Sequence, residues 1–264
     1  MPSTDSLSIT FLGTGTSLGI PVIGCKCKVC TSPDPRNHRT RSSLYVESTQ
    51  TSFVIDTGPD FRSQCLRENV RKVDAAVYTH PHSDHIMGFD DLRPFCFGDH
   101  ATMPVYATPE CLTQLQKAFG FAFDLANWNP VYLKPVASPV TGPFQIADVH
   151  LTPLEVVHGN VRTVGYLLGT DTRRLAAYIP DCKQIPDHTI DLMRGVDTLI
   201  IDCLRLQPHW THMSLEEALA VRDAVKSRQT WLTHISDQLD HATLQAGLAE
   251  DVRVAYDGLK LLLS

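Results

Sequence analysis

A cluster of metal-ligand residues occupies six consecutive positions of this chain, His80-Pro-His82-Ser-Asp84-His85. The cluster directly follows an apolar run, residues 73–79, of the kind that forms a buried β-strand. Imidazole nitrogens and carboxylate oxygens both bind zinc and manganese, and a turn at the end of a rigid strand can hold such ligands in place. A solvated polar loop would more often contain lysine or glutamate, and this loop has neither. The cluster therefore predicts a metal site at the end of a buried strand.

Length and composition favour one domain over residues 1–264. The chain is 43% hydrophobic, and no linker or low-complexity segment divides it. Its net charge of −6 argues against a broad nucleic-acid-binding surface. Residues 1–8 lack a basic segment followed by an apolar one, and no apolar run approaches the roughly 18 residues of a membrane span. We therefore expect a cytoplasmic protein without membrane contact, whose eight cysteines are thiols and metal ligands.

Short apolar runs separated by turn residues predict strands in both halves of the chain. They are residues 7–12, 43–47, 52–56, 73–79, 149–157, 164–168, 175–179, 198–202, 230–233 and 252–256. One helix should begin after Thr108, with Pro109 in its first turn, and end near Phe119; another should begin after the capping box at Ser214 and end near Lys226. Strands in two groups with helices between them indicate two mixed sheets packed face to face, with the helices outside.

Ligand-type residues recur where later strands end. His158 closes the strand expected to end at Val157, and Asp181 and His234 follow two further strands. Each of them alone could equally be a solvated or hydrogen-bonded strand end, but functional groups also gather at such places because a sheet holds them rigidly. With the six-residue cluster they complete a two-metal set, in which Asp181 would bridge ions about 3.5 to 4 Å apart. One ion would be held by His80, His82 and His158, and the other by Asp84, His85 and His234.

A strand, His-x-His-x-Asp-His and a distant His, Asp and His together resemble the metallo-β-lactamase superfamily over nearly the whole chain. The resemblance implies an α+β fold, the αββα sandwich of two mixed sheets with helices on the outer faces. It also matches Asp56, in Ile55-Asp56-Thr57-Gly58, to the superfamily's strand-end acid, which we expect to support the metal ligands from behind. This fold hosts hydrolysis of β-lactams, thioesters, phosphodiesters and RNA as well as redox roles, so membership alone does not select the substrate.

Three cysteines within six residues, Cys25, Cys27 and Cys30, predict a second metal site near the N-terminus. Three thiolates so close together need one more ligand to form a tetrahedral structural zinc site, which leaves no open position for chemistry. The alternative is a loop of reduced thiols exposed to oxidation. The preceding glycine-rich segment, 13–21, is a weak signal because it lacks the Lys-Ser/Thr that completes a phosphate-binding loop.

The Gly-Thr-Gly-Thr-Ser start at Gly13, the Cys-x-Cys-x-x-Cys loop and the superfamily ligands together resemble the PhnP-type phosphoribosyl cyclic phosphate phosphodiesterases. In that family the fourth zinc ligand is a histidine three residues after the last active-site histidine, but Asp237 occupies this position here. Either Asp237 coordinates through oxygen or His241, one helical turn later, replaces it. We favour His241, because a zinc with three thiolates more often takes nitrogen than oxygen.

The same resemblance implies the reaction. Two divalent ions, zinc or manganese, would hydrolyse a cyclic phosphodiester, 5-phosphoribosyl 1,2-cyclic phosphate, to a ribose bisphosphate in phosphonate breakdown. Asp84 would act within the catalytic centre, and His212 lies where the family places a catalytic histidine that protonates the leaving alkoxide; a polar helix start is the simpler interpretation of His212. His209 is the weaker candidate for that role, and Arg93 is a speculative phosphate anchor whose simpler interpretation is a solvated surface charge. We also expect a homodimer.

Two other classes remain open. A tRNA 3′-processing nuclease would share the start and the ligands, but no Gly/Lys/Arg-rich arm for gripping tRNA is present. A cofactor-biosynthesis protein of the PQQ-associated type carries a similar cysteine loop and acts by binding or oxidation. The remaining histidines are expected at the surface and the remaining cysteines in the core. These are His38, His100, His150 and His188, and Cys65, Cys96, Cys111, Cys182 and Cys203.

Overall fold

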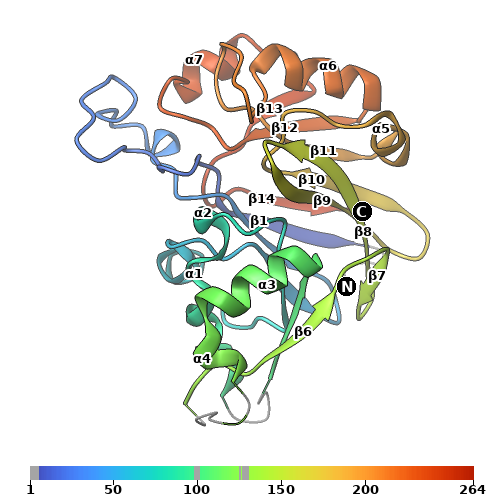
Figure 1. The fold of residues 1–264 in the computed structure, drawn as a ribbon. Helices are drawn as coiled ribbons and strands as arrows, with labels where there is room; N and C mark the ends of the chain where they lie inside the picture. The colour runs from blue at the N-terminus through green and yellow to red at the C-terminus, as the bar shows by residue number, and fades with distance from the viewer. Residues whose placement is uncertain (1–5, 98–101, 125, 127–130) are drawn as a thin grey trace.

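Two seven-stranded sheets form the centre of the fold (Figure 1). The computed structural model of the chain describes residues 6–97, 102–124, 126 and 131–264. The first sheet has the order β14 (Lys260–Leu263), β1 (Leu7–Gly13), β2 (Ser43–Glu47), β3 (Ser52–Ile55), β4 (Ala75–Val77), β5 (Met103–Ala107) and β6 (Pro135–Pro139). The second has the order β13 (Val252–Val254), β12 (Gln229–Thr233), β11 (Thr198–Asp202), β10 (Arg174–Ile179), β9 (Val161–Gly169), β8 (Val149–His158) and β7 (Phe144–Ile146).

Helices cover the outer face of each sheet, which gives four layers (Figure 1). Over the first sheet lie α1 (Phe61–Glu68), α3 (Pro109–Ala118) and α4 (Gly120–Phe123), and over the second lie α5 (Asp187–Met193), α6 (Leu215–Val225) and α7 (His241–Ala246). The short α2 (Ser83–Ile86) and the 3-10 segments η1 (Pro35–Asn37) and η2 (Phe89–Cys96) complete the described helices. The predicted αββα sandwich is confirmed.

Both sheets are buried on two sides, and this explains their continuous apolar strands. In β10, for example, Ala176 and Tyr178 pack into the core between the sheets, whereas Ala177 and Ile179 pack under the outer helices.

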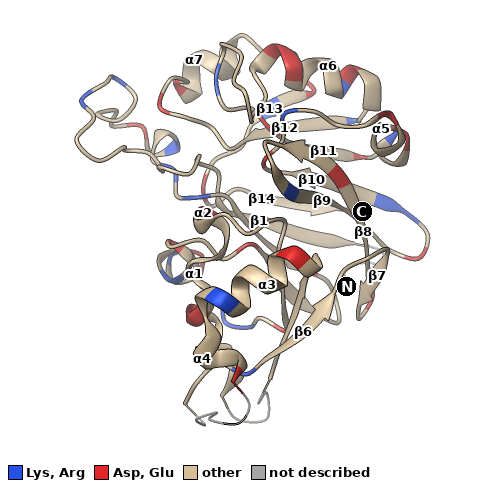
Figure 2. Cartoon of the chain, in the orientation of Figure 1, with Lys and Arg blue, Asp and Glu red and all other residues tan. Residues whose placement is uncertain are grey.

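The two predicted helices begin as expected: Thr108 caps α3, and the capping box of Ser214 and Glu217 opens α6. Charged residues of both signs are interspersed over the ribbon in Figure 2. No helix among the described residues is long and apolar enough to cross a membrane.

The parallel strands bring the expected ligands to one edge. Strands β3, β4 and β5 run parallel in the first sheet, as do β10, β11 and β12 in the second. Because parallel strands end on the same side, the residues after their carboxyl ends lie close together. Asp56 follows β3, the segment 80–85 follows β4, Asp181 follows β10, Asp202 ends β11 and His234 follows β12.

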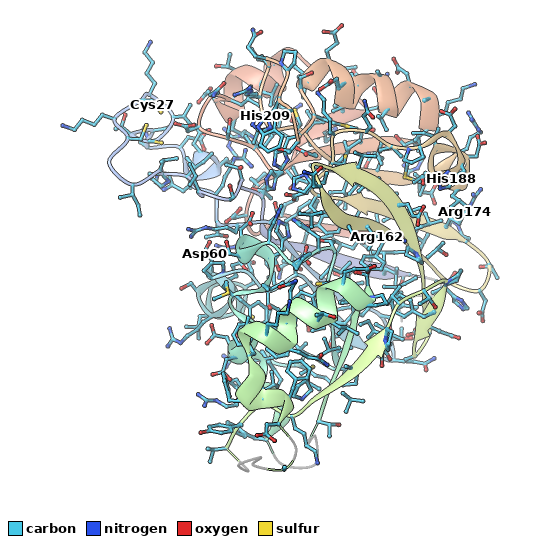
Figure 3. All side chains as sticks on the ribbon, viewed as in Figure 1. Cys27, Asp60, Arg162, Arg174, His188 and His209 are labelled. Carbon is cyan, nitrogen blue, oxygen red and sulfur yellow. The ribbon has the colours of Figure 1, made fainter. Side chains whose placement is uncertain are left out.

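Several predicted boundaries need correction. The strand expected over 73–79 is only Ala75–Val77, because the chain turns toward the ligand cluster immediately afterwards, and the one expected over 252–256 ends at Val254. Four strands at or near the sheet edges and most short helices were not predicted. The segment between β1 and β2, residues 14–42, projects from the sandwich as an arm that carries the cysteine triplet (Figures 1 and 3).

Candidate metal centre

The seven predicted ligands converge on one buried cluster. His80, His82 and His158 bring their nitrogens within 4.8 Å of one another, and the same holds for the ligand atoms of His80, His85 and Asp181 and of Asp84, Asp181 and His234. Asp181 belongs to both of the last two groups. Its Oδ1 lies 3.2 Å from both His85 Nε2 and His234 Nδ1, and its Oδ2 lies 3.9 Å from His80 Nε2 and 3.8 Å from His158 Nε2.

Residues behind the cluster fix the orientation of its rings. The buried carboxylate of Asp56 accepts hydrogen bonds from the Thr79 backbone N–H and hydroxyl, and lies 2.8 Å from His85 Nδ1. His158 Nδ1 lies 2.9 Å from the carbonyl oxygen of Thr211, so its other nitrogen is left for the cluster. Asp56 therefore has the supporting position expected for it, of the kind that orients metal-binding imidazoles.

Two non-glycine residues of this region have left-handed backbone conformations. Asp56 has φ = 66° and His234 has φ = 58°. Such conformations cost of order 1–3 kcal/mol for ordinary side chains and persist where the surrounding structure enforces them, often at functional sites. Both residues come directly after buried strands, β3 and β12, whose ends determine where the two side chains point.

The donor set fits a divalent metal. Three buried side-chain atoms, His85 Nε2, Asp181 Oδ1 and His234 Nε2, make no hydrogen bond, although the first two lie 3.2 Å apart, and this is a costly arrangement unless a ligand satisfies them. Burial lowers the pKa values of His80, His82 and His158, which keeps these imidazoles in the neutral form that binds metal. Burial also acts to lower the pKa of His85, but the neighbouring carboxylates raise it above its usual value. Imidazole and carboxylate together suit zinc and manganese.

His212 lies beside this cluster and is paired with a buried carboxylate. Its ring centroid is 4.7 Å from those of both His158 and His234, and its Nδ1 lies 2.7 Å from Asp202 Oδ2. Burial acts to lower the pKa of His212, but the Asp202 carboxylate raises it to about 8. Burial raises the pKa of Asp202 to about 7. With Nδ1 oriented by Asp202, Nε2 is the nitrogen left to exchange a proton with a substrate.

Asp202 was not among the predicted site residues. It ends the apolar strand β11 in the same way as Asp56 follows β3 and Asp181 follows β10, and this shared position was a signal for it in the sequence. Ser42, whose hydroxyl lies 3.1 Å from His234 Nδ1, gave no comparable signal because it comes from the arm, far away in the chain.

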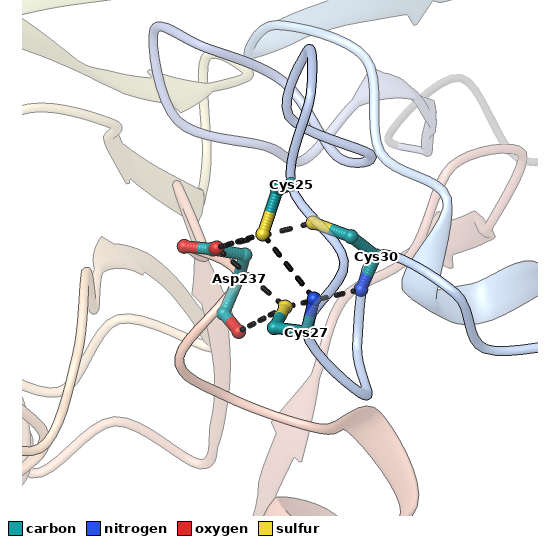
Figure 4. A group of neighbouring side chains, drawn as sticks. All are labelled: Cys25, Cys27, Cys30 and Asp237. Atoms are coloured by element: carbon teal, nitrogen blue, oxygen red, sulfur yellow. Dashed lines mark hydrogen bonds between the residues drawn. The ribbon is translucent and has the colours of Figure 1, made fainter.

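The cysteine triplet forms a second cluster with Asp237 (Figure 4). Asp237 Oδ2 lies 3.5 Å from Cys25 Sγ, 3.7 Å from Cys27 Sγ and 3.9 Å from Cys30 Sγ. Backbone N–H groups of Val22, Cys27 and Cys30 donate to the three sulfurs. The Cys30 N–H lowers the pKa of the Cys27 thiol, whereas burial raises the pKa of Cys30 to about 12. Three sulfurs and one carboxylate at these separations have the composition of a four-ligand metal site.

The preference for His241 beside the thiols is corrected. His241 is the first residue of α7, where its Nδ1 lies 3.1 Å from the guanidinium of the buried Arg39 and its ring contacts Tyr256. Asp237, on the loop before α7, takes the position next to the sulfurs. The spacing of one helical turn was misleading because the helix begins only at His241, where the backbone N–H donates to Asn37 and the ring faces Arg39, so that this histidine contacts another part of the arm than the three sulfurs.

The weaker candidates lie apart from the cluster or at its rim. Arg93 lines a separate hollow of about 430 Å³ with Arg62 and Arg71, and its guanidinium is 4.0 Å from Asp90. His209 is half-buried, and its ring centroid lies 5.4 Å from that of His212. His38 and His188 are exposed and His150 partly so, while His100 lies outside the described residues. Of the other cysteines, Cys65, Cys111, Cys182 and Cys203 are buried, and Cys96 is half-buried.

Comparisons with known proteins agree with this geometry. The model of the beta-lactamase superfamily domain matches residues 51–235. The chain belongs to the beta-lactamase superfamily. A solved structure described as a new diphosphatase from the PhnP family superposes on this chain with a TM-score of 0.89. The two chains are 38% identical, and the superposition covers 97% of each. The chain thus has a PhnP-like metallo-β-lactamase fold, with a cluster of residues that could hold metal ions.

Two curated relatives have other names. The octanoyltransferase of Porphyromonas gingivalis is 33% identical to this chain over 262 residues, which cover 96% of this chain but only 51% of that relative. The chain therefore spans about half the length of that protein. Coenzyme PQQ synthesis protein B of Methylorubrum populi is 26% identical over 225 residues, which cover 74% of this chain and 72% of the relative.

Proposed function

We propose that the protein is a phosphoric diester hydrolase that uses two divalent ions to open a small cyclic phosphate. The observation that supports this most directly is the position of His212 and Asp202 beside the seven-ligand cluster, because it combines a metal site with a proton donor. The resemblance to PhnP-type enzymes makes 5-phosphoribosyl 1,2-cyclic phosphate the substrate of choice, with a ribose bisphosphate as product.

In this proposal the seven ligands divide between two ions. His80, His82 and His158 would hold one ion and Asp84, His85 and His234 the other, with Asp181, whose carboxylate oxygens face histidines of both groups, shared between them. When bound, such ions supply Lewis acidity to phosphoryl oxygens and lower the pKa of a water molecule toward neutrality. Asp56 and the Thr211 carbonyl orient the imidazoles of His85 and His158 from behind.

His212 has the role of general acid. Asp202 holds its Nδ1, so that Nε2 can donate a proton to the sugar oxygen that leaves phosphorus. A sugar alkoxide is a poor leaving group, and protonation is therefore the contribution that the protein itself must make to bond cleavage. The ring contacts of His212 with His158 and His234 place this donor beside the ligand cluster.

We assign the arm cluster of Cys25, Cys27, Cys30 and Asp237 to a structural zinc. Such a site has no open coordination position and contributes directly to folding. It would fix the arm to the loop that also carries His234. The homodimer remains a prediction, which sedimentation of the purified protein tests.

A screen of metal-loaded protein tests the proposed activity. The substrates are 5-phosphoribosyl 1,2-cyclic phosphate, 2′,3′-cyclic nucleotides, linear diesters and inorganic and organic diphosphates, each tested with zinc and with manganese. We expect the cyclic diesters to be hydrolysed with the highest kcat/KM. A preference for diphosphates by at least tenfold would replace the diester proposal with the second candidate, which rests on the relative described as a diphosphatase at 38% identity.

A further inference from the structure

Trp210 is one of the most exposed large hydrophobic residues in the described part of the chain, with 78% of its surface accessible. It belongs to the segment that follows β11 and precedes α6, residues 203–214, which also carries His209 and His212. An isolated exposed hydrophobic residue needs no explanation in general. Trp210 differs because of the rigidity of its segment and the place at which that segment lies.

Hydrogen bonds hold the segment at both ends and in the middle. Leu204 N–H donates to the Met213 carbonyl, and Leu215 N–H donates to the Arg205 carbonyl, which closes the segment into a loop. The Arg205 guanidinium donates to the carbonyls of Gln207 and Pro208 inside this loop. The position of Trp210 is therefore determined by a braced backbone.

The part of the loop next to Trp210 contacts the candidate metal centre. Thr211 presents its carbonyl to His158, one of the predicted metal ligands. At the neighbouring Gly159, with φ = 56°, a Cβ atom would be 3.1 Å from Thr211 Cγ2 and 3.9 Å from Trp210 Cζ3. The indole thus lies over the turn that follows His158, and glycine leaves no side chain there to cover it.

A chain of aromatic rings leads from the ligand cluster to this indole. The centroids of His234 and His212 are 4.7 Å apart, those of His212 and His209 5.4 Å, and those of His209 and Trp210 6.1 Å. His209 is half-buried and lies between the arm and the second sheet in the view of Figure 3. His212 and His209 thus lie between the ligand cluster and Trp210 in this row of rings.

We propose that Trp210 is a specificity-determining residue whose indole stacks on the base of a nucleoside cyclic phosphate, so that it favours this substrate over base-free sugar phosphates. In a nucleoside 2′,3′-cyclic phosphate the ribose carries the base away from phosphorus, and Trp210 is the ring at the outer end of the row that begins at the ligand cluster. A rigid, exposed indole provides stacking area with little loss of conformational entropy. This inference rests on the proposed phosphodiesterase function and names a residue that selects among its substrates.

Kinetics on a matched pair of substrates tests the role of the indole. We expect Trp210→Ala in the metal-loaded full chain to raise KM for 2′,3′-cyclic AMP by roughly 5- to 150-fold, the range of base–aromatic stacking, with little change in kcat. KM for base-free 5-phosphoribosyl 1,2-cyclic phosphate should change less than twofold. Trp210→Phe should retain most of the preference for the nucleotide. Leu206→Ala is the control, because Leu206 is 56% exposed in the same segment.

Fluorescence gives a readout that does not need turnover. Adenosine 3′-monophosphate should quench the emission of the exposed Trp210 saturably, whereas ribose 5-phosphate should not, and the quench should disappear in Trp210→Phe. Absence of this quench overturns the inference, as does an equal rise of KM on both substrates or a change of oligomeric state in Trp210→Ala without substrate selectivity. If the protein hydrolyses neither substrate, the proposed function fails while the quench still decides whether Trp210 stacks on a base.

Discussion

Asp181 illustrates how much one residue can contribute at this centre. Its two carboxylate oxygens face four histidines, and one of those oxygens has no hydrogen-bond partner. Such a carboxylate is suited to contact two ions at once, whereas each histidine nitrogen can bind only one.

We expect Asp181→Ala to lose at least one ion from the centre together with most of the activity, because the remaining ligands no longer hold the pair together. Metal analysis of the purified variant measures the first effect and turnover the second. Asp191→Ala is the matched control, since the Asp191 side chain is 68% exposed on α5 and forms a surface ion pair with Arg194. A variant with the full complement of ions and normal turnover would show that Asp181 is no bridge.

His212 should affect proton transfer and leave metal binding intact. We expect His212→Ala to lower kcat by roughly 10²- to 10⁴-fold on a substrate with a sugar alkoxide leaving group, the usual contribution of a positioned proton donor. A nitrophenolate departs without a proton, so the loss on a nitrophenyl diester should be much smaller. Metal analysis should find the wild-type ion content. Equal losses on the two substrates would instead make His212 a positioning residue.

At the scale of elements, the arm depends on its cysteine cluster. The small apolar cluster around Ile20, Val29 and Cys30 is the only hydrophobic core found within the described part of the arm. We expect Cys27→Ser to release one zinc and to lower the melting temperature, because the metal contributes folding free energy that so small a core cannot replace. Zinc content and a thermal scan measure both effects. An unchanged zinc content would refute the structural site.

Replacements of Asp237 and His241 should separate metal binding from packing. Asp237→Ala should lower the zinc content, because it removes the oxygen next to the three sulfurs. His241→Ala should keep the zinc and still cost about 1–3 kcal/mol of stability, because it removes a partner of the buried Arg39 guanidinium. Zinc content and urea unfolding of both variants measure the difference. The opposite pattern would restore His241 as the fourth ligand.

The sequence predicts the elements that bury an apolar face and misses those that depend on their neighbours. The strands β10 and β11 and the capped helix α6 carry local signals, and the structure has them where expected. β6 contains two prolines and mostly exposed residues, and α5 and α7 have only two turns or fewer, so that packing rather than propensity stabilises them.

The candidate site was predictable for the same reason and within the same limits. Strand ends marked the seven ligands, and the structure brings them together, because a parallel sheet converts sequence position into spatial proximity. Asp237 could not be chosen over His241 from spacing alone, since the choice depends on where α7 begins relative to the arm.

At the scale of the whole molecule, the ligand cluster joins the two halves of the sandwich. His80, His82, Asp84 and His85 follow a strand of the first sheet, whereas in the second sheet His158 ends β8 and Asp181 and His234 follow β10 and β12. Bound ions should therefore stabilise the complete fold. At a free metal concentration of about 100 Kd we expect ~2.7 kcal/mol of additional stability and a corresponding rise in melting temperature after reconstitution of chelator-treated protein.

The Asp181→Ala variant provides the comparison for this measurement. With or without added metal, the melting temperature of this variant should stay close to that of chelator-treated wild-type protein, because its centre cannot hold the pair of ions. If neither zinc nor manganese changes the melting temperature of the wild-type protein, the two halves are joined by packing alone.

One short segment belongs to both clusters. His234 lies in the buried ligand cluster and Asp237 beside the cysteines, while Ile235 between them exchanges backbone hydrogen bonds with Thr14 and Thr16 at the base of the arm. Evolution can lengthen a surface turn such as that at Gly142, where an added Cβ meets nothing within 4 Å. It cannot add a residue between His234 and Asp237 without moving one of them out of its cluster. The number of residues from His234 to Asp237 is thus constrained by both clusters at once, whereas the residue types around them are less constrained.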